Sequence, residues 1–250
     1  PYELFAMSSK MSEMLMDGDI IHCGQLYYGV VYNGLSALSL LEGNLLGTAY
    51  PLCRGAIEMY IKLLILNTRT EYYDWYEKFR MFEVEYSCRQ AYPEKFSALF
   101  EKRDCQDSKA RADYLHFGWV DFIEGYHETV RKFPYSIYGI ITFLKEKNED
   151  RILALERLES FYKACHAYTH GSIQTAKYPV LHYFEISIML YYVIRDTFLL
   201  ICGEKGVEAL VNGDDIISMI DRDFEVLYGQ YEIRSTDLFE RYYASGSSEN

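Results

Sequence analysis

The chain has 250 residues, half of them hydrophobic, and it is rich in aromatic side chains, with 25 tyrosines and 14 phenylalanines. A formal charge of −12 argues against general electrostatic binding of nucleic acid, because such binding needs a basic surface. It does not exclude a small basic pocket. Only five prolines occur and no Ser/Gly linker precedes the C-terminal tail, so we expect one compact domain over 1–250.

The cysteines indicate a reducing compartment. The six are scattered, form no C-x-x-C pattern and follow no secretory signal, which favours reduced, mostly buried thiols in a cytoplasmic protein. They are Cys23, Cys53, Cys88, Cys105, Cys165 and Cys202.

Helical periodicity dominates the first third of the chain and predicts an all-α protein. A short helix is expected over 2–16, and a long one over about 20–46 that Gly47 is placed to end. The next helix covers about 49–68, with Pro51 in its first turn. Its apolar residues lie on every face, so it should be buried all round.

The rest of the chain is also expected to be helical, with one irregular section. Thr70 is a suitable N-cap for the next helix, and Pro93 should open a short one. The aromatic and glycine residues of 116–127 predict a packed loop or a broken helix. Further helices are expected over 136–147, 150–170 (stopped by Gly171), 179–201 and 214–230.

Four long apolar helices predict the architecture. They cover about 20–68 and 150–202, and they should form an antiparallel four-helix bundle with the segment 70–147 as an insertion packed on its side. The apolar runs 27–46 and 183–202 are as long as a membrane span, but charged and amide residues interrupt both. Buried bundle helices therefore explain them better, and no membrane contact is expected.

The helix 49–68 carries three charged residues in an apolar setting. Arg54, Glu58 and Lys62 are four positions apart, so they form one polar stripe. A buried charge costs several kcal/mol unless it is paired, so the stripe should meet partners from elsewhere, and the segment 162–171 offers the best candidates. The pair Arg54 and Glu58 is either a buried ion pair that fixes helix register or part of a catalytic or anion-binding set.

The helix 150–170 has a titratable edge beside its apolar stripe. Glu159, Tyr162, His166 and His170 follow one another at spacings of three, four and four. The two histidines can exchange protons near neutral pH, bind one metal ion, or simply bond to carbonyls at a helix end. No Walker loop, G-x-G-x-x-G, H-E-x-x-H or G-x-S-x-G motif is present, so the common nucleotide, zinc-protease and serine-hydrolase classes lack support.

An Arg-x-x-x-Glu on an apolar helix (Arg54, Glu58) followed by a distant Tyr and a His at a helix end (Tyr162, His170) resembles a bacterial family of uncharacterised all-α proteins near the HEPN superfamily (higher eukaryote and prokaryote nucleotide-binding domains). The resemblance covers about 20–68 and 150–202. Many proteins of that superfamily are metal-independent ribonucleases of toxin–antitoxin and phage-defence systems that act as dimers.

The resemblance implies site residues as well as a fold. The superfamily signature is an Arg, a polar residue, a few variable positions and a His on one helix, which places His170 at the His and His166 at the polar residue. Cys165 stands at the Arg position, and this departure argues against nuclease activity. If the chemistry is kept, His170 acts at the ribose 2′-hydroxyl, Arg54 supplies the cation for phosphate, and Glu58, His166 and Tyr162 assist.

Three hypotheses follow. The first is a HEPN-like protein of a bacterial defence or stress system that cleaves RNA or senses a nucleotide, without a cofactor or metal, and that forms a homodimer. The second is a non-catalytic helical module that binds a partner protein or a small ligand. The third is a metal site formed by His166, His170 and Glu58, which the nearby Arg54 disfavours because a cation repels a metal ion.

Overall fold

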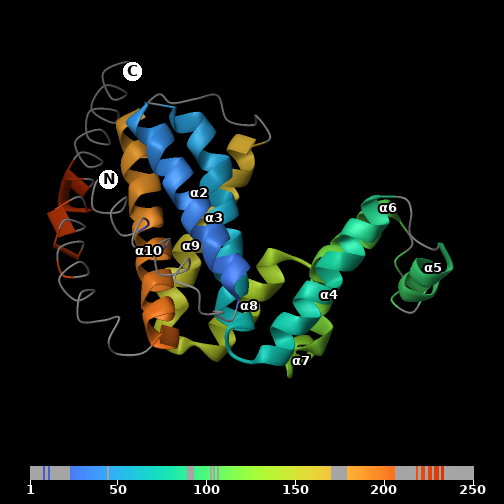
Figure 1. Cartoon of the computed structure of the whole chain (residues 1–250). Helices are drawn as coiled ribbons and strands as arrows, with labels where there is room; N and C mark the ends of the chain where they lie inside the picture. The colour runs from blue at the N-terminus through green and yellow to red at the C-terminus, as the bar shows by residue number, and fades with distance from the viewer. Residues whose placement is uncertain are drawn as a thin grey trace, which may run out of the picture. The chain divides into compact units, whose positions relative to one another are not determined.

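The computed structural model describes residues 23–43, 45–88, 93–101, 103, 105, 107–169 and 179–205, with isolated residues outside these ranges. Every element within them is a helix and none is a strand, which confirms the all-α class (Figure 1). The elements are α2 (Gly24–Glu42), α3 (Leu46–Leu66), α4 (Thr70–Ser87), α5 (Pro93–Glu101), α6 (Ser108–Phe117), the 3-10 helix η1 (Gly118–Phe122), α7 (Tyr126–Thr129), α8 (Ile137–Lys147), the 3-10 helix η2 (Glu149–Arg151), α9 (Ile152–Thr169) and α10 (Pro179–Lys205).

The chain divides into two compact units. The first unit comprises Pro1–Tyr60 and Ser160–Asn250, and the second unit comprises Ile61–Glu159. The division resembles the predicted core and insertion. Its boundaries, however, fall inside α3 and inside α9, whereas the insertion was expected to begin after α3 and to end before α9. The single domain expected over 1–250 stays a prediction.

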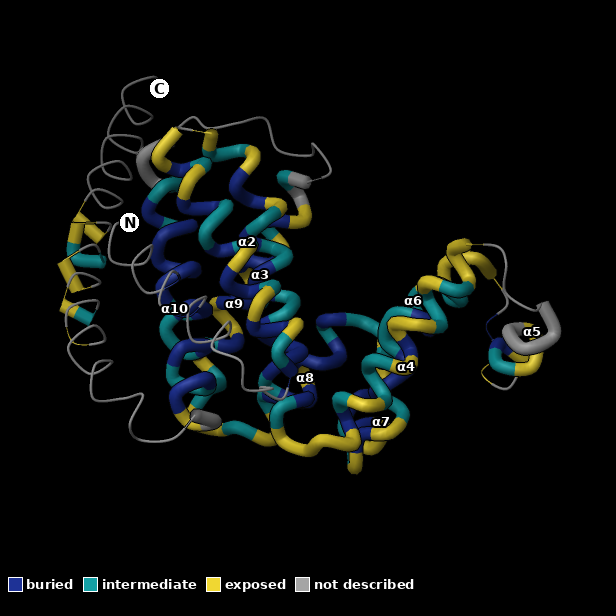
Figure 2. Tube along the Cα trace, in the orientation of Figure 1, coloured by how far each residue is buried: buried dark blue, intermediate teal, exposed yellow. Residues whose placement is uncertain are grey.

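In the first unit, α2 packs against both α3 and α10. The α2 residue Asn33 lies against Gly55 and Met59 of α3, and Gly34 of α2 packs on Ile194 of α10. Figure 2 shows the dark, buried positions that line the inner faces of α2 and α10. The buried residues of α2 recur at helical spacing, which explains why this helix packs by one face.

The polar residues that interrupt the apolar run of α10 have partners inside the first unit. Tyr60 of α3 donates to Asp196 over 2.8 Å, and Arg195 donates to both carboxylate oxygens of Asp221 over 2.7 and 2.9 Å. By length and composition alone, the stretch 182–203 is apolar enough to cross a membrane, and 67% of its most apolar window is buried inside the protein. The expected absence of membrane contact stays a prediction.

The predicted bounds of the first two long helices need correction. The helix expected over 20–46 spans Gly24–Glu42, with Gly43 as its C-cap, and Gly47 lies inside α3 instead of ending α2. Pro51 is the sixth residue of α3 rather than part of its first turn. Because proline lacks an N–H, α3 gives up one backbone hydrogen bond there, and packing of the following apolar residues holds the helix together.

The helices expected over 2–16 and 214–230 lie mostly outside the described residues. Gly171 lies outside them as well. In the second unit, Thr70 is the first residue of α4 rather than its N-cap, because Arg69 holds the N-cap position without a side-chain hydrogen bond. Pro93 opens α5 as expected.

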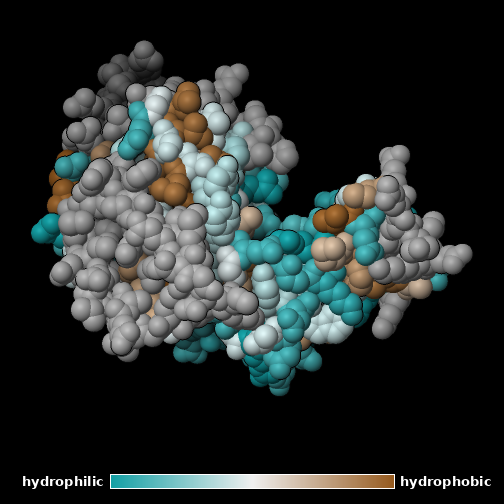
Figure 3. All heavy atoms as spheres, viewed as in Figure 1, coloured by the Kyte–Doolittle hydropathy of each residue, from teal (hydrophilic) through white to brown (hydrophobic). Residues whose placement is uncertain are grey.

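The second unit has an aromatic core formed mainly by α4, α6 and η1. Trp119 of η1 is buried against the edge of Tyr76, and Phe79 of α4 meets Tyr114 of α6 edge to face. The broken helix expected over 116–127 is confirmed, since α6 passes into η1 and then, after a turn at Gly125, into α7. In Figure 3 the second unit is mostly hydrophilic on the visible face, while Met81 and Val84 of α4 are more than half exposed.

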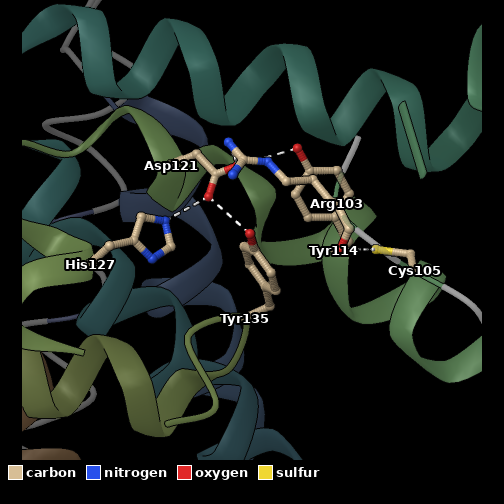
Figure 4. A network of polar contacts seen from close by, with 6 residues as sticks. All are labelled: Arg103, Cys105, Tyr114, Asp121, His127 and Tyr135. Atoms are coloured by element: carbon tan, nitrogen blue, oxygen red, sulfur yellow. Dashed lines mark hydrogen bonds and ion pairs between the residues drawn. The ribbon is translucent and has the colours of Figure 1, made fainter. Parts of the chain in front are cut away.

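A buried carboxylate ties several segments of the second unit together (Figure 4). The Asp121 side chain is only 2% exposed, and its Oδ2 lies 2.7 Å from Nη2 of Arg103. The hydroxyl of Tyr114 donates to Oδ2 over 3.2 Å. On the other oxygen, Oδ1, Tyr135 donates over 3.0 Å and His127 Nε2 lies at 2.7 Å. Four partners satisfy a charge that would otherwise be too costly to bury.

Candidate functional site

The predicted meeting of α3 with the segment around Tyr162 is confirmed inside the first unit. Arg54 Nε donates to the Tyr162 hydroxyl over 3.3 Å, and this hydroxyl donates to Oε2 of Glu58 over 3.3 Å. The Arg54 guanidinium also lies over the Tyr162 ring, 5.3 Å from its centroid. One phenol therefore bridges the two charged residues across 104 and 108 positions of sequence.

The electrostatics of this bridge keep the phenol neutral. Burial, followed by the Glu58 carboxylate, raises the pKa of Tyr162 to about 12, although Arg54 opposes the shift. At neutral pH the hydroxyl therefore keeps its proton and can donate to Glu58 while it accepts from Arg54.

The prediction that α3 is buried all round is wrong. Arg54 and Glu58 are half-buried and Pro51 is exposed. Because Arg54 and Glu58 keep contact with solvent, the desolvation cost of their charges is lower than it would be in a fully buried stripe. The third member, Lys62, is buried and belongs to the second unit, where its ammonium donates to Nε2 of His116 over 2.9 Å.

A second polar group lies on the same side of α3, one turn before Arg54. The Tyr50 hydroxyl lies 2.5 Å from Nδ1 of His182 and donates to Oε2 of Glu185 over 3.2 Å. The Tyr168 ring stacks on Tyr50 with 3.9 Å between centroids, and its hydroxyl lies 3.1 Å from His182 Nε2. Side chains from α3, α9 and α10 thus surround one imidazole.

Cys165 connects the two groups, because one charged residue of each group acts on the pKa of its thiol. Burial raises the pKa of Cys165 to about 12; Glu185 adds to the shift and Arg54 reduces it. The guanidinium and the Glu185 carboxylate therefore act on the same buried sulfur. We call the combined set the α3–α9–α10 cluster: Tyr50, Arg54, Glu58, Tyr162, Cys165, Tyr168, His182 and Glu185.

The predicted histidines have different outcomes. His166 is exposed on α9. His170 lies outside the described residues, so its expected meeting with Arg54 stays a prediction.

Sequence reasoning missed four members of the cluster, namely Tyr50, Tyr168, His182 and Glu185. The two tyrosines fit the apolar pattern of their helices, and Glu185 is one of the charged residues that interrupt the apolar run 183–202, so the sequence singles out none of the three. The available signal was a His and a Glu three apart, His182 and Glu185, near the start of a long apolar helix.

A second place also has the signature spacing. Arg111 and His116 are five positions apart on α6, as the Arg and His of the superfamily signature would be, but the position after Arg111 is alanine rather than polar. His116 Nδ1 lies 3.1 Å from both oxygens of Glu83, while Lys62 donates to its Nε2. An ammonium can only donate, so the Nε2 of His116 accepts and its Nδ1–H donates to Glu83.

Within the described part of the chain, no group of three or more His, Cys, Asp or Glu residues is arranged to hold a metal ion. The hypothetical metal site of His166, His170 and Glu58 includes a residue outside that part. Arg54 and Tyr162 occupy the surroundings of Glu58, which does not favour a metal ion at this carboxylate.

The thiols offer a direct check of burial. All six cysteines are reduced, and all except Cys88 are buried. Burial also raises the pKa of Cys53, which leaves little reactive thiolate. We expect one thiol per chain to react rapidly with a chromogenic disulfide reagent at pH 8 and the other five only after denaturation. Two or more fast thiols, or retention of the fast phase in a Cys88→Ser variant, would contradict the described packing.

No protein-family model matches the chain, and no curated protein or solved structure was found to be similar to it.

Proposed function

We propose that the first unit is a HEPN-like bundle of a bacterial defence or stress system that cleaves RNA without a metal ion, at the α3–α9–α10 cluster. The observation that carries the proposal is the convergence of the half-buried Arg54 and Glu58 on Tyr162, one turn of α3 from Tyr50, which contacts an imidazole. Catalysis of this kind requires a fixed cation and a proton-transfer group near each other, and the cluster supplies both.

Each member has a role in this proposal. The Arg54 guanidinium stabilises the negative charge that develops on the phosphate during attack by the ribose 2′-hydroxyl. Tyr162 and Glu58 hold the guanidinium in place through the phenol bridge. The candidates for proton transfer include His166, on the same helix as Tyr162, and His170, which lies outside the described residues.

The test is cleavage of transfer RNA and total RNA by the purified chain in the presence of EDTA. Arg54→Gln and His170→Ala are each expected to slow cleavage about 100-fold, since removal of one transition-state contact costs about 10²–10³ in rate. Arg80→Gln, at a partly exposed arginine of α4, is the matched control and should cleave like the wild type. Equal activity of the wild type and His170→Ala would remove His170 from the site, and no cleavage by the wild type would reject the proposed function.

His116→Asn decides between the two places that carry a signature-like pattern. Loss of activity in this variant, with full activity in Arg54→Gln, would assign the RNA-cleaving site to α6 in the second unit. Loss only in the Arg54 and His170 variants supports the α3–α9–α10 cluster.

The second candidate function is a non-catalytic module that binds a partner protein or small ligand. It is favoured by the net charge of −12 and by the engagement of Arg54 with Tyr162 and Glu58. In that case no variant changes RNA, and Arg54→Ala only lowers the free energy of unfolding, by about 1–3 kcal/mol for a charge-assisted contact.

A further inference from the structure

We propose that His182 is the acid–base residue of the α3–α9–α10 cluster, with Tyr50 and Glu185 as its positioning residues and a ribose 2′-hydroxyl as the group it deprotonates. This inference rests on the proposed function, and it assigns proton transfer to a residue that lies outside the superfamily signature.

The hydrogen bonds around His182 define its tautomer. The Tyr50 hydroxyl has a single proton, which it donates to Glu185 Oε2 over 3.2 Å. The same hydroxyl oxygen, 2.5 Å from Nδ1, then accepts the Nδ1–H of His182. With its proton on Nδ1, the ring has an acceptor lone pair on Nε2. The Tyr168 hydroxyl, 3.1 Å away, donates to it in the resting protein, and the substrate 2′-hydroxyl would replace this donor. This arrangement of a base oriented by a neighbouring group is the usual requirement of proton-transfer catalysis.

Tyr50 is rigid enough to orient the ring. Its side chain is buried at 1% exposure, and its ring packs against Phe161 and stacks on Tyr168. Burial is the main cause that raises the pKa of Tyr50 far above its ordinary value, so the phenol stays protonated at any pH at which the protein is handled. The hydroxyl is therefore a fixed hydrogen-bonding group rather than a competing base.

Glu185 supplies the charge that a working base needs. Its Oε2 lies 3.4 Å from Nδ1 of His182, and the carboxylate stabilises the imidazolium that forms once Nε2 takes a proton. The side chains of Glu185 and His182 are 42% and 23% exposed, so solvent and substrate can reach this end of the cluster.

The other titratable groups near His182 come from each packed element. From α3 it is Tyr50, and from α9 it is Tyr168, whose hydroxyl lies 3.1 Å from Nε2. Arg54 and Cys165 are connected to this group through Glu185, because the charges of Glu185 and Arg54 both act on the Cys165 thiol. On α10, the neighbour of His182 is Tyr183, whose pKa is raised by burial and, to a lesser extent, by the charge of Glu42 of α2. Among the charged groups in this list, Arg54 is the cation, so a phosphate at Arg54 would lie one turn of α3 from Tyr50, which contacts the imidazole of α10.

The step balances without a cofactor. Nε2 of His182 takes the 2′ proton, the 2′ oxygen forms a bond to phosphorus, and the bond from phosphorus to the 5′ oxygen breaks. The 5′ oxygen takes a proton from water. The products are a 2′,3′-cyclic phosphate end and a 5′-hydroxyl end.

The test measures the rate and pH profile of RNA cleavage for four variants of the full chain. His182→Asn should lower the rate at least about 100-fold, the range of general acid–base catalysis, and should flatten the acid limb of the pH profile. Tyr50→Phe and Glu185→Gln should keep the fold, lower the rate less, and shift that limb. Tyr183→Phe, next to His182 and on the same helix, is the matched control and should match the wild type in rate and profile.

A second readout separates catalysis from a structural role. Added imidazole should restore part of the activity of His182→Gly and none of Arg54→Gln, with circular dichroism confirming that each variant is folded. Activity of folded His182→Asn within threefold of wild type, while Arg54→Gln is inactive, would overturn the role of His182 and leave the proposed function standing. Absence of RNA cleavage by the wild type itself would overturn both.

Discussion

Replacing Asp121 by alanine should lower the free energy of unfolding of the second unit by about 3–5 kcal/mol, the usual cost of removing one partner from a buried charge pair. The variant leaves the Arg103 guanidinium and the hydroxyls of Tyr114 and Tyr135 without the carboxylate that they contact. A buried donor without an acceptor costs its full desolvation penalty, so the losses reinforce one another.

The measurement can be made selective for the second unit. Both tryptophans of the chain, Trp75 and Trp119, belong to this unit, so their fluorescence during urea denaturation reports its unfolding. Asp121→Asn is the milder variant, because the amide keeps the shape and part of the hydrogen bonding. It should fall between the wild type and the alanine variant.

The matched control is another carboxylate–arginine contact of the same unit. Glu124 and Arg69 approach to 3.0 Å with side chains 76% and 56% exposed, and such surface pairs contribute about 0–1 kcal/mol. Glu124→Gln should therefore leave the fluorescence transition almost unchanged. If Asp121→Ala shifts the transition no more than Glu124→Gln does, the buried network does not stabilise this unit.

The sequence was sufficient to predict the all-α class and the contact of α3 with Tyr162. The second followed from electrostatics, because Arg54 and Glu58 in an apolar helix need a polar partner and Tyr162 stood on the polar edge of a distant helix. The same argument failed to predict His182, because a histidine near a helix start carries no comparable demand. Only the fold brings Tyr50 to it across 132 positions.

Helix ends were predicted less well and the Asp121 network was not predicted, for a physical reason in each case. Gly47 and Pro51 are local signals for helix ends, yet the apolar residues of α3 overrode both. Asp121 sits in the irregular section, where no periodicity shows which residues face inward. Its four partners come from 103 to 135 and meet through turns that side-chain patterns do not encode.

Two glycine-to-alanine substitutions should change stability in opposite directions. At Gly139 of α8, a Cβ atom would lie 2.7 Å from the Tyr126 hydroxyl and 2.8 and 2.9 Å from the carbonyl oxygens of Phe133 and Pro134. Two of these are backbone atoms, and Phe133 already holds a left-handed conformation with φ of 52°, so the segment cannot easily move away. Gly139→Ala should therefore lower the free energy of unfolding of the second unit by about 1–3 kcal/mol, the usual cost of overpacking.

Gly203, near the end of α10 in the first unit, is exposed, and an added Cβ would meet nothing within 4 Å. Alanine loses less backbone entropy in a helix, so Gly203→Ala should raise the free energy of unfolding by about 0.5–1 kcal/mol. Because the tryptophans belong to the second unit, Gly139→Ala is followed by fluorescence and Gly203→Ala by circular dichroism at 222 nm, a wavelength at which all helices contribute. A stabilising Gly139→Ala would show that the turn before α8 is free to rearrange, and a destabilising Gly203→Ala would show that the end of α10 is closely packed in solution.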